Sequence, residues 1–327
     1  METTPGIRHI SVVGAGYMGH GIALGFALAG YPVRLHDRTD EILAKALAAS
    51  GEDLATLVDA GAIEPNRVTP TLARIHPTTL LGEAVADADL VVEAVPEELP
   101  LKQALFAELD ALCPPGAILA SNTSTFPPSE LAVVTRRPER VLVAHYFHPP
   151  HLLPLVELVP SPATSAETLE AVRQLLTGIG KQPVIVQREV AGFVANRLQA
   201  ALFREALAIV AEGIATAEDV DAVVTSGFGR RLAVLGPFAA MDLAGLDVVL
   251  RVMERLVPEI AASPEVPPLL RETVAAGRTG VKSGAGFRDW PPAASRDVRE
   301  RLARALVAIA GWSRAQPDGT DRHREPD

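Results

Sequence analysis

The chain has 327 residues, of which 48% are hydrophobic, so it can bury a substantial core without disulfide or metal support. Its 40 acidic and 30 basic side chains give a formal net charge of -10, which disfavours nucleic-acid phosphates as partners. No apolar stretch is long enough to span a membrane, so membrane insertion is excluded as well.

Cysteine usage and the N-terminal sequence predict a cytoplasmic protein. The single cysteine, Cys113, has no partner for an intramolecular disulfide. No charged-then-apolar leader precedes the first strand-like segment.

The first half alternates short apolar runs with helical patterns, which is typical of a parallel sheet with crossover helices. Each run is bounded by Gly, Pro, Asn or Asp. The expected strands are His9–Val13, Pro32–His36, Leu90–Ala94, Ile118–Ser121, Val141–His145, Leu155–Val159 and Pro183–Val186. We therefore expect an α/β fold with a Rossmann-type, doubly wound parallel sheet.

From Phe193 onward, apolar residues recur at helical spacing and no strand pattern follows. Helices are expected after Phe193 and at Ala217–Thr225, Met241–Leu256, Pro268–Ala276 and Ser295–Ala310. The predicted domains are residues 1–188 for nucleotide binding, 189–312 as an all-α domain for substrate binding and dimerisation, and 313–327 as a disordered polar tail.

The segment Gly14-Ala15-Gly16-Tyr17-Met18-Gly19 follows the first strand and opens a helix. Glycine permits a tight turn, a close approach to a pyrophosphate and close helix–strand packing, whereas a plain glycine-rich turn is the alternative. Asp37 follows the second strand at the distance expected for a ribose-binding carboxylate. Asp37 favours NAD over NADP, and the neighbouring Arg38 keeps NADP as the minor alternative.

Two polar segments at strand ends carry candidate chemistry. The first runs from Ser121 through Asn122 to Thr125, and the second begins at His145. Glu157 lies inside an apolar strand, where a buried carboxylate needs a partner. A His145–Glu157 pair would be a general base suited to neutral pH, whereas the alternative is a structural glutamate paired with an arginine.

Taken together, the motifs resemble those of the L-3-hydroxyacyl-CoA dehydrogenase family from His9 to Trp290. The matching segments are GAGYMGHGIA, VVEAVPE, ASNTS, HYFHP followed by PLVELV, GFVANR, LGPFAAMDLAGLD and KSGAGF. The resemblance implies an NAD-dependent dehydrogenase that oxidises a 3-hydroxy group to a ketone.

The resemblance also implies roles for individual residues. His145 would remove the hydroxyl proton, and Glu157 would orient the imidazole of His145. Ser124 and Asn196 would hold the substrate's oxygens. Cofactor contacts are expected at Gly14, Gly16, Tyr17, Met18, Gly19, Asp37, Glu97, Lys102, Asn122, His148 and Lys282.

The sequence departs from the family pattern at two places. His148 stands where the family usually has an asparagine near the nicotinamide. In the helical hairpin after the second strand, Thr56–Ile63 contains no lysine, although CoA-using members carry several there to meet the CoA phosphates. A CoA thioester, and with it a place in fatty-acid metabolism, is therefore one of two alternatives.

The other alternative is a small free acid. The stretch between Gly227 and Gly236 is longer than in CoA-using members, which is similar to the branch containing lambda-crystallin and the L-gulonate, carnitine and pyridoxine-catabolism dehydrogenases. Arg231 in this insert would bind a substrate carboxylate bidentately, or it is a solvated loop residue together with Arg230.

Three other interpretations compete with this one. A metal site at His145, His148 and His151 is disfavoured because two prolines interrupt the spacing. The 6-phosphogluconate-like class needs a lysine on the first helix of the second domain, and none lies between Lys181 and Lys282. A non-catalytic NAD(H)-binding protein on the same scaffold is the remaining alternative.

The apolar helices of the second half lack a closing partner within the chain, and the family dimerises through them. We therefore expect a homodimer, a small-molecule substrate, and no metal, nucleic acid or membrane as partner.

Overall fold

The computed structural model describes residues 6–314 and divides them into two compact units. The first unit contains the chain up to Asn196, together with Ala303–Ala310, and the second runs from Arg197 to Leu302. The tail expected at 313–327 lies outside the described residues, apart from Ser313 and Arg314 at the end of the last helix.

The first unit is built on an eight-stranded sheet with the order β3-β2-β1-β4-β5-β6-β7-β8. Neighbouring strands are parallel except β6 and β7, which are antiparallel. The strands are β1 Ile10–Val13, β2 Val33–His36, β3 Ile75–Thr78, β4 Leu90–Glu93, β5 Ile118–Ser121, β6 Val141–Tyr146, β7 Leu155–Pro160 and β8 Gln182–Ile185.

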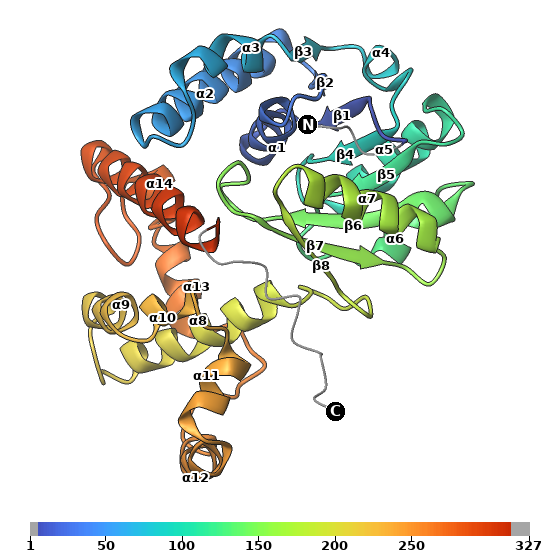
Figure 1. Ribbon diagram of the computed structural model, residues 1–327. Coiled ribbons are helices and arrows are strands. Elements are labelled where there is room, and N and C mark those ends of the chain that lie inside the picture. Colours follow the sequence, from blue (N-terminus) through green and yellow to red (C-terminus); the bar gives the residue numbers. More distant parts are fainter. Residues whose placement is uncertain (1–5, 315–327) are drawn as a thin grey trace, which may run out of the picture. The chain divides into compact units, whose positions relative to one another are not determined.

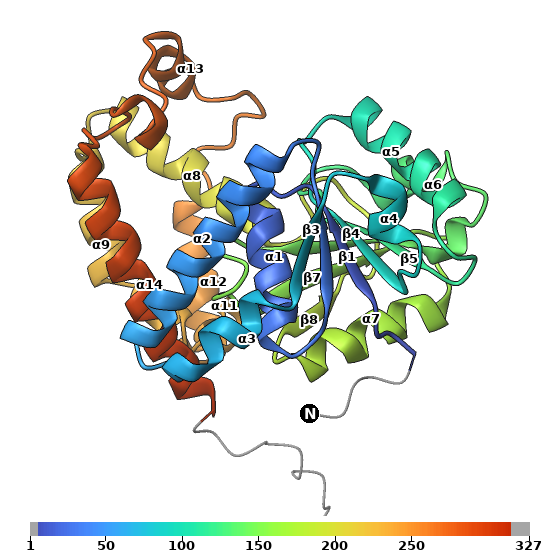
Figure 2. The same ribbon diagram turned by 90° about the horizontal axis from the view of Figure 1, so that it is seen from above.

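Helices cover both faces of this sheet, as Figures 1 and 2 show. The larger core packs α1 (Tyr17–Leu28) and α7 (Ala166–Gly178) against one face. The other face is covered by α4 (Leu81–Val85), α5 (Leu99–Leu112) and α6 (Pro128–Ala132). A hairpin of α2 (Asp40–Asp59) and α3 (Val68–Leu72) packs beside α1. The predicted doubly wound α/β fold is confirmed.

Strand β3 is not among the strands expected from the sequence. Its segment, Ile75–Thr78, has one buried apolar residue, Ile75, and contains Pro77, which cannot donate to a ladder. β3 pairs with β2 alone and forms the edge of the sheet. An edge position tolerates proline, so tertiary pairing rather than apolar pattern makes this segment a strand.

The second unit is helical, as predicted. Its helices are α8 Ala195–Ala211, α9 Ala217–Ser226, α10 Gly229–Leu232, α11 Pro237–Ala244, α12 Leu246–Leu256, α13 Pro268–Ala275 and most of α14, Pro292–Arg314. The single helix expected at Met241–Leu256 is wrong in one respect, because Gly245 adopts a φ of +88° and separates α11 from α12. Among the described residues, no helix is long and apolar enough to cross a membrane.

Candidate active site

The glycine-rich turn between β1 and α1 leaves no room for side chains at two of its glycines. Gly14 adopts a φ of +100°, and a Cβ there would lie 2.6 Å from the Ala94 carbonyl oxygen. A Cβ at Gly19 would lie 1.7 Å from the Gly14 carbonyl oxygen. A Cβ at Gly16 would meet nothing within 4 Å, so its open side allows close approach of a ligand. This cradle fits a dinucleotide pyrophosphate at the start of α1, the helix that begins with Tyr17 and Met18.

Asp37 lies directly after β2 and braces this turn. Its Oδ2 accepts from the Ala15 amide at 2.7 Å, and its Oδ1 accepts from the Arg38 amide at 2.7 Å. The strand order reverses between β1 and β4, which is where doubly wound sheets bind ligands. A carboxylate at this position suits a ribose diol and repels a 2′-phosphate.

His145 and Glu157 form a buried pair on the two antiparallel strands. They occupy opposed positions of β6 and β7, and His145 Nδ1 lies 2.9 Å from Glu157 Oε2. His145 is 5% exposed and Glu157 is 1% exposed. Burial alone would raise the pKa of Glu157, but the hydrogen bonds from His145, Ala195 and Val194 outweigh it and lower that pKa overall. An ionised Glu157 holds Nδ1 protonated and leaves Nε2 free to act as a base.

Glu157 also fixes the start of α8. Its Oε1 accepts from the amides of Val194 at 3.0 Å and Ala195 at 2.8 Å. The preceding residue, Phe193, is fully buried and has a φ of +48°, a left-handed conformation that is costly for a bulky side chain. One carboxylate therefore orients the base and places the first turn of α8, which carries Asn196.

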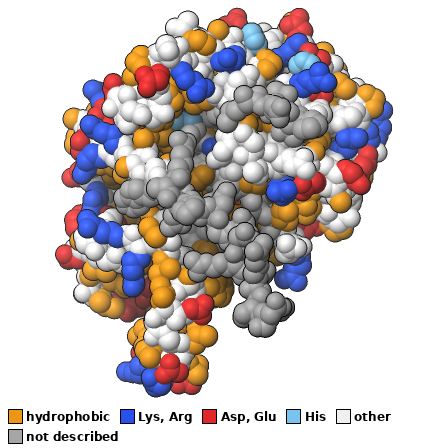
Figure 3. Space-filling model, viewed as in Figure 1, with side chains coloured by type: hydrophobic (Ala, Val, Ile, Leu, Met, Phe, Trp, Pro, Cys, Tyr) orange, Lys and Arg blue, Asp and Glu red, His pale blue; other side chains and the backbone are white. Residues whose placement is uncertain are grey.

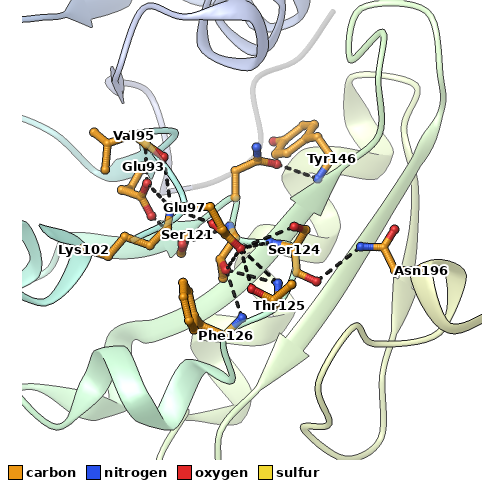
Figure 4. Close-up of polar contacts among 12 residues, drawn as sticks. Glu93, Val95, Glu97, Lys102, Ser121, Ser124, Thr125, Phe126, Tyr146 and Asn196 are labelled. Carbon is orange, nitrogen blue, oxygen red and sulfur yellow. Dashed lines mark hydrogen bonds and ion pairs between the residues drawn. The ribbon is translucent and has the colours of Figure 1, made fainter. Parts of the chain in front are cut away.

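Glu97 organises the loop after β5 (Figure 4). Its Oε1 accepts from the Thr123 hydroxyl at 2.6 Å, the Ser124 amide at 2.9 Å and the Thr125 hydroxyl at 2.8 Å. Asn196 Nδ2 donates to the Ser124 carbonyl at 3.3 Å. Ser124 and Asn196 therefore lie side by side, as the proposed substrate-holding pair requires.

A buried ion pair that the sequence analysis missed lies beneath this loop. Glu93, at the end of β4, is 0% exposed and Lys102 is 1% exposed, with Nζ 2.7 Å from Glu93 Oε1. Glu93 Oε2 also accepts from the Ser121 hydroxyl at 2.5 Å, and Lys102 Nζ lies 3.3 Å from Glu97 Oε2. A carboxylate inside an apolar strand was the signal that identified Glu157, and the same signal was available for Glu93. Lys102 is thus placed behind Glu97, and its expected contact with the cofactor stays a prediction.

Asn122 and two aromatic rings complete the surroundings of the base. Asn122 Oδ1 accepts from the Tyr146 amide at 2.9 Å, which ties the end of β5 to the end of β6. The Phe147 ring centroid lies 4.4 Å from that of His145, and the Phe193 centroid lies 5.6 Å away. Both rings pack close to the imidazole, which is itself buried.

The three histidines between His145 and His151 have different partners. His145 pairs with Glu157, the His148 Nε2 lies 2.9 Å from the Tyr17 hydroxyl, and the His151 Nδ1 lies 3.5 Å from Asp53 Oδ2. The contact of His148 with Tyr17 places it beside the start of α1. Its predicted proximity to the nicotinamide remains a prediction.

Two predicted site residues belong to the second unit. Arg231 lies on α10 and its side chain is exposed. Lys282 lies in the 3-10 turn Val281–Ser283, beside an apolar pocket of about 740 Å³ within that unit. The first unit therefore brings together Glu97, Asn122, Ser124, His145, Glu157 and Asn196, but neither Arg231 nor Lys282.

Comparison with known families decides the assignment. Residues 9–190 match the family described as 3-hydroxyacyl-CoA dehydrogenase, NAD binding domain, and residues 192–290 match its C-terminal domain. The chain belongs to the 3-hydroxyacyl-CoA dehydrogenase family. It is an NAD-dependent dehydrogenase that acts on CH–OH groups.

The dehydrogenase has relatives that differ in substrate. It is 34% identical to 5-formyl-3-hydroxy-2-methylpyridine 4-carboxylate 5-dehydrogenase of Mesorhizobium japonicum, over 93% of this chain and 97% of the relative. It is 36% identical to L-carnitine dehydrogenase of Streptomyces coelicolor, over 92% of this chain and 96% of that relative. It is 40% identical to a probable 3-hydroxybutyryl-CoA dehydrogenase of Bacillus subtilis, over 87% of this chain and 98% of that relative.

Solved structures show the same two groups. The crystal structure of a 5-formyl-3-hydroxy-2-methylpyridine 4-carboxylic acid 5-dehydrogenase superposes with a TM-score of 0.88 at 33% identity, covering 95% of this dehydrogenase and all of that chain. The structure of (S)-3-hydroxybutyryl-CoA dehydrogenase from Ralstonia eutropha gives a TM-score of 0.70 at 35% identity, covering 87% and 99%.

Proposed function

We propose that this dehydrogenase oxidises the 3-hydroxy group of a small free carboxylic acid, using His145 as general base. The buried His145–Glu157 pair carries the chemical part of the proposal. The choice of a free acid as substrate class rests on the composition of the hairpin after β2.

In the proposed reaction, His145 Nε2 accepts the hydroxyl proton while the substrate carbon loses hydride. The ionised Glu157 stabilises the imidazolium that forms. Ser124 and Asn196 hold the reacting oxygen and fix its orientation toward the base. NAD, when bound, accepts the hydride. Phe147 and Phe193 keep water from His145, which strengthens its interaction with Glu157.

The hairpin after β2 is poorly suited to CoA phosphates. Thr56–Ile63 has no basic residue, and the exposed charged side chains on either side of the turn, Asp59 and Glu64, are acidic. The nearest arginine, Arg67, donates to the Leu28 carbonyl at 2.5 Å and is used within the fold. Acidic side chains repel the anionic phosphates of CoA, so this surface favours a substrate that is not bound to CoA.

The alternative substrate is a 3-hydroxyacyl-CoA. The 40% identity to the probable Bacillus subtilis 3-hydroxybutyryl-CoA dehydrogenase is the observation that favours it. For the free-acid substrate, we propose that Arg231 binds the carboxylate, because an exposed guanidinium matches it with two hydrogen bonds.

We further propose that the chain works as a cytoplasmic homodimer held together by the second unit. In the described part of the chain, helices α8, α9, α11, α12 and α13 bury none of their residues. Figure 3 shows hydrophobic side chains gathered over α11 and α12 at the lower end of the view. Phe238 and Leu243 are each 78% exposed, and apolar side chains gathered into an exposed patch favour an interaction surface.

The first test follows NAD reduction with free 3-hydroxy acids, among them L-gulonate, L-carnitine and 3-hydroxybutyrate, and NADH oxidation with acetoacetyl-CoA. We expect turnover with a free acid and little with the CoA ester. His145→Gln should lower kcat by about a thousandfold while leaving NADH binding nearly intact, since it removes the base and not the cradle. Arg231→Ala should raise the KM for the free acid about tenfold.

Each part of the proposal has a contradicting outcome. Fast turnover of acetoacetyl-CoA without any free-acid activity would contradict the free-acid substrate and favour a 3-hydroxyacyl-CoA instead. Full activity of His145→Gln would overturn the base. An unchanged KM in Arg231→Ala would remove that arginine from the site. Arg230→Ala, the neighbouring arginine whose Nε donates to the Thr225 carbonyl at 3.2 Å, is the matched control.

A further inference from the structure

A second buried cluster of titratable groups lies outside the catalytic pair, in the first turns of α1. His20 is 6% exposed, and its Nδ1 lies 3.1 Å from the Gly16 carbonyl oxygen. Its Nε2 lies 3.1 Å from Asp53 Oδ2, on α2. The same Asp53 oxygen lies 3.5 Å from Nδ1 of His151, on the loop between β6 and β7, and the His151 side chain is 7% exposed.

The partners of His20 dictate its charge. A peptide carbonyl and a carboxylate oxygen can only accept hydrogen bonds, so both ring nitrogens of His20 must donate. An imidazole with two N–H groups is the protonated form. A neutral His20 would leave a lone pair facing either the Gly16 carbonyl or the Asp53 carboxylate, and one of the two contacts would become repulsive.

Protonated His20 contacts the glycine-rich turn and lies close to the β6–β7 loop. The Gly16 carbonyl belongs to the glycine-rich turn that would hold the pyrophosphate of NAD, so His20 braces that turn from inside α1. A Cβ added to Gly21 would lie 2.7 Å from Pro150 Cγ and 3.4 Å from His151 Nδ1, which shows how closely the β6–β7 loop touches α1. The same loop carries His148, hydrogen-bonded to Tyr17.

We propose that protonated His20, held by Asp53, is a positioning residue that couples NAD(H) affinity to pH by bracing the glycine-rich turn. This inference rests on the nucleotide site described above and adds a residue to it. As pH rises and His20 loses its proton, the brace fails and the cofactor binds more weakly.

The surrounding charges support a single protonated site. Burial lowers the pKa of His20, but the hydrogen bonds to Asp53 and to the Gly16 carbonyl outweigh it and raise that pKa overall. For His151, burial lowers the pKa, and the attraction of Asp53 is offset by the nearby His20, Lys181 and His148. Tyr17, whose ring meets that of His20 edge-on with the centroids 5.7 Å apart, is the remaining titratable neighbour.

The test combines two readouts on the full-length protein. Long-range ¹H–¹⁵N spectra of histidine-labelled protein between pH 6 and 9.5 report the protonation of His20, assigned by loss of its signal in His20→Gln. NADH fluorescence gives the cofactor affinity over the same range. We expect both His20 nitrogens to be protonated at neutral pH, and NADH affinity to fall about tenfold through the His20 midpoint, the worth of one charge-assisted hydrogen bond.

Asp53→Asn should shift both midpoints to lower pH together and raise the KM for NAD at pH 8, with kcat at saturating NAD nearly unchanged. Glu52→Gln, an exposed neighbour on the same helix, should change neither midpoint. A neutral His20 at pH 7 in the wild-type protein would overturn the inference. An NADH affinity that stays constant over this pH range would overturn it as well. Absence of NADH binding at every pH would instead contradict the nucleotide site, and the spectra would still decide the protonation of His20.

Discussion

At the scale of single residues, Glu157 is the position on which the site depends most. It faces His145 through one oxygen and the first amides of α8 through the other. Removing its charge therefore weakens both the hydrogen bond that orients His145 and the contacts that place Asn196. Its lowered pKa means that the ionised form stabilises the fold above the usual glutamate range and that this contribution is lost as the pH falls through the folded-state pKa.

Glu157→Gln should reduce kcat about a hundredfold, because a neutral amide cannot stabilise the imidazolium, and lower the Tm by a few degrees. The stability difference from wild type should shrink as the pH falls below the ordinary glutamate pKa of 4.5 and through the lowered pKa of folded Glu157. Steady-state kinetics and thermal unfolding between pH 3 and 8 measure both effects. Glu212→Gln, an exposed position, is the control; a kcat equal to wild type would refute the orienting role.

At the scale of elements, most of the fold could be predicted from the sequence because every strand except β3 is a short, largely apolar run between turn residues. β3 escaped this pattern because it is an edge strand containing Pro77, and the α11–α12 break depends on the conformation of Gly245. His145 and Glu157 were found because a carboxylate in an apolar strand needs a partner. The cluster of His20, Asp53 and His151 could not be found, since only packing brings α1, α2 and the β6–β7 loop together.

The Glu93–Lys102 pair joins β4 to α5 and, through Ser121, to β5. Lys102→Met should destabilise the protein by about 3–5 kcal/mol, because it leaves a buried carboxylate without its cation. The double variant Glu93→Gln/Lys102→Met should recover a large part of this loss. Urea unfolding of the two single variants, Glu93→Gln and Lys102→Met, and of the double variant gives the coupling free energy. Losses that simply add would show that the two side chains do not act as a pair.

At the scale of the whole molecule, the two units differ in how they bury apolar side chains. The first has a continuous core on each face of its sheet, whereas the described helices α8, α9, α11, α12 and α13 of the second bury no residue. Leu246 and Leu250 project from the same face of α12 and are 60% and 58% exposed. The proposed homodimer would cover this face with a second copy of the chain.

Leu250→Glu should therefore weaken association by at least about tenfold, because a charge in an apolar interface must be desolvated. Sedimentation velocity over a range of protein concentrations measures the shift toward monomer. Glu254→Gln, exposed on the same helix, should leave the dissociation constant unchanged. A wild-type protein that is monomeric at high concentration would disprove the homodimer.

The opposition of His145 and Glu157 across β6 and β7 has a consequence for folding quality. Side chains alternate between the faces of a sheet, so a slip of one residue between these strands would turn Glu157 to the opposite face. A slipped molecule could keep its helices and still bind NADH, yet it would have no competent base. Specific activity, divided by the NADH-binding capacity of a preparation, thus counts the molecules whose central strands are in correct alignment.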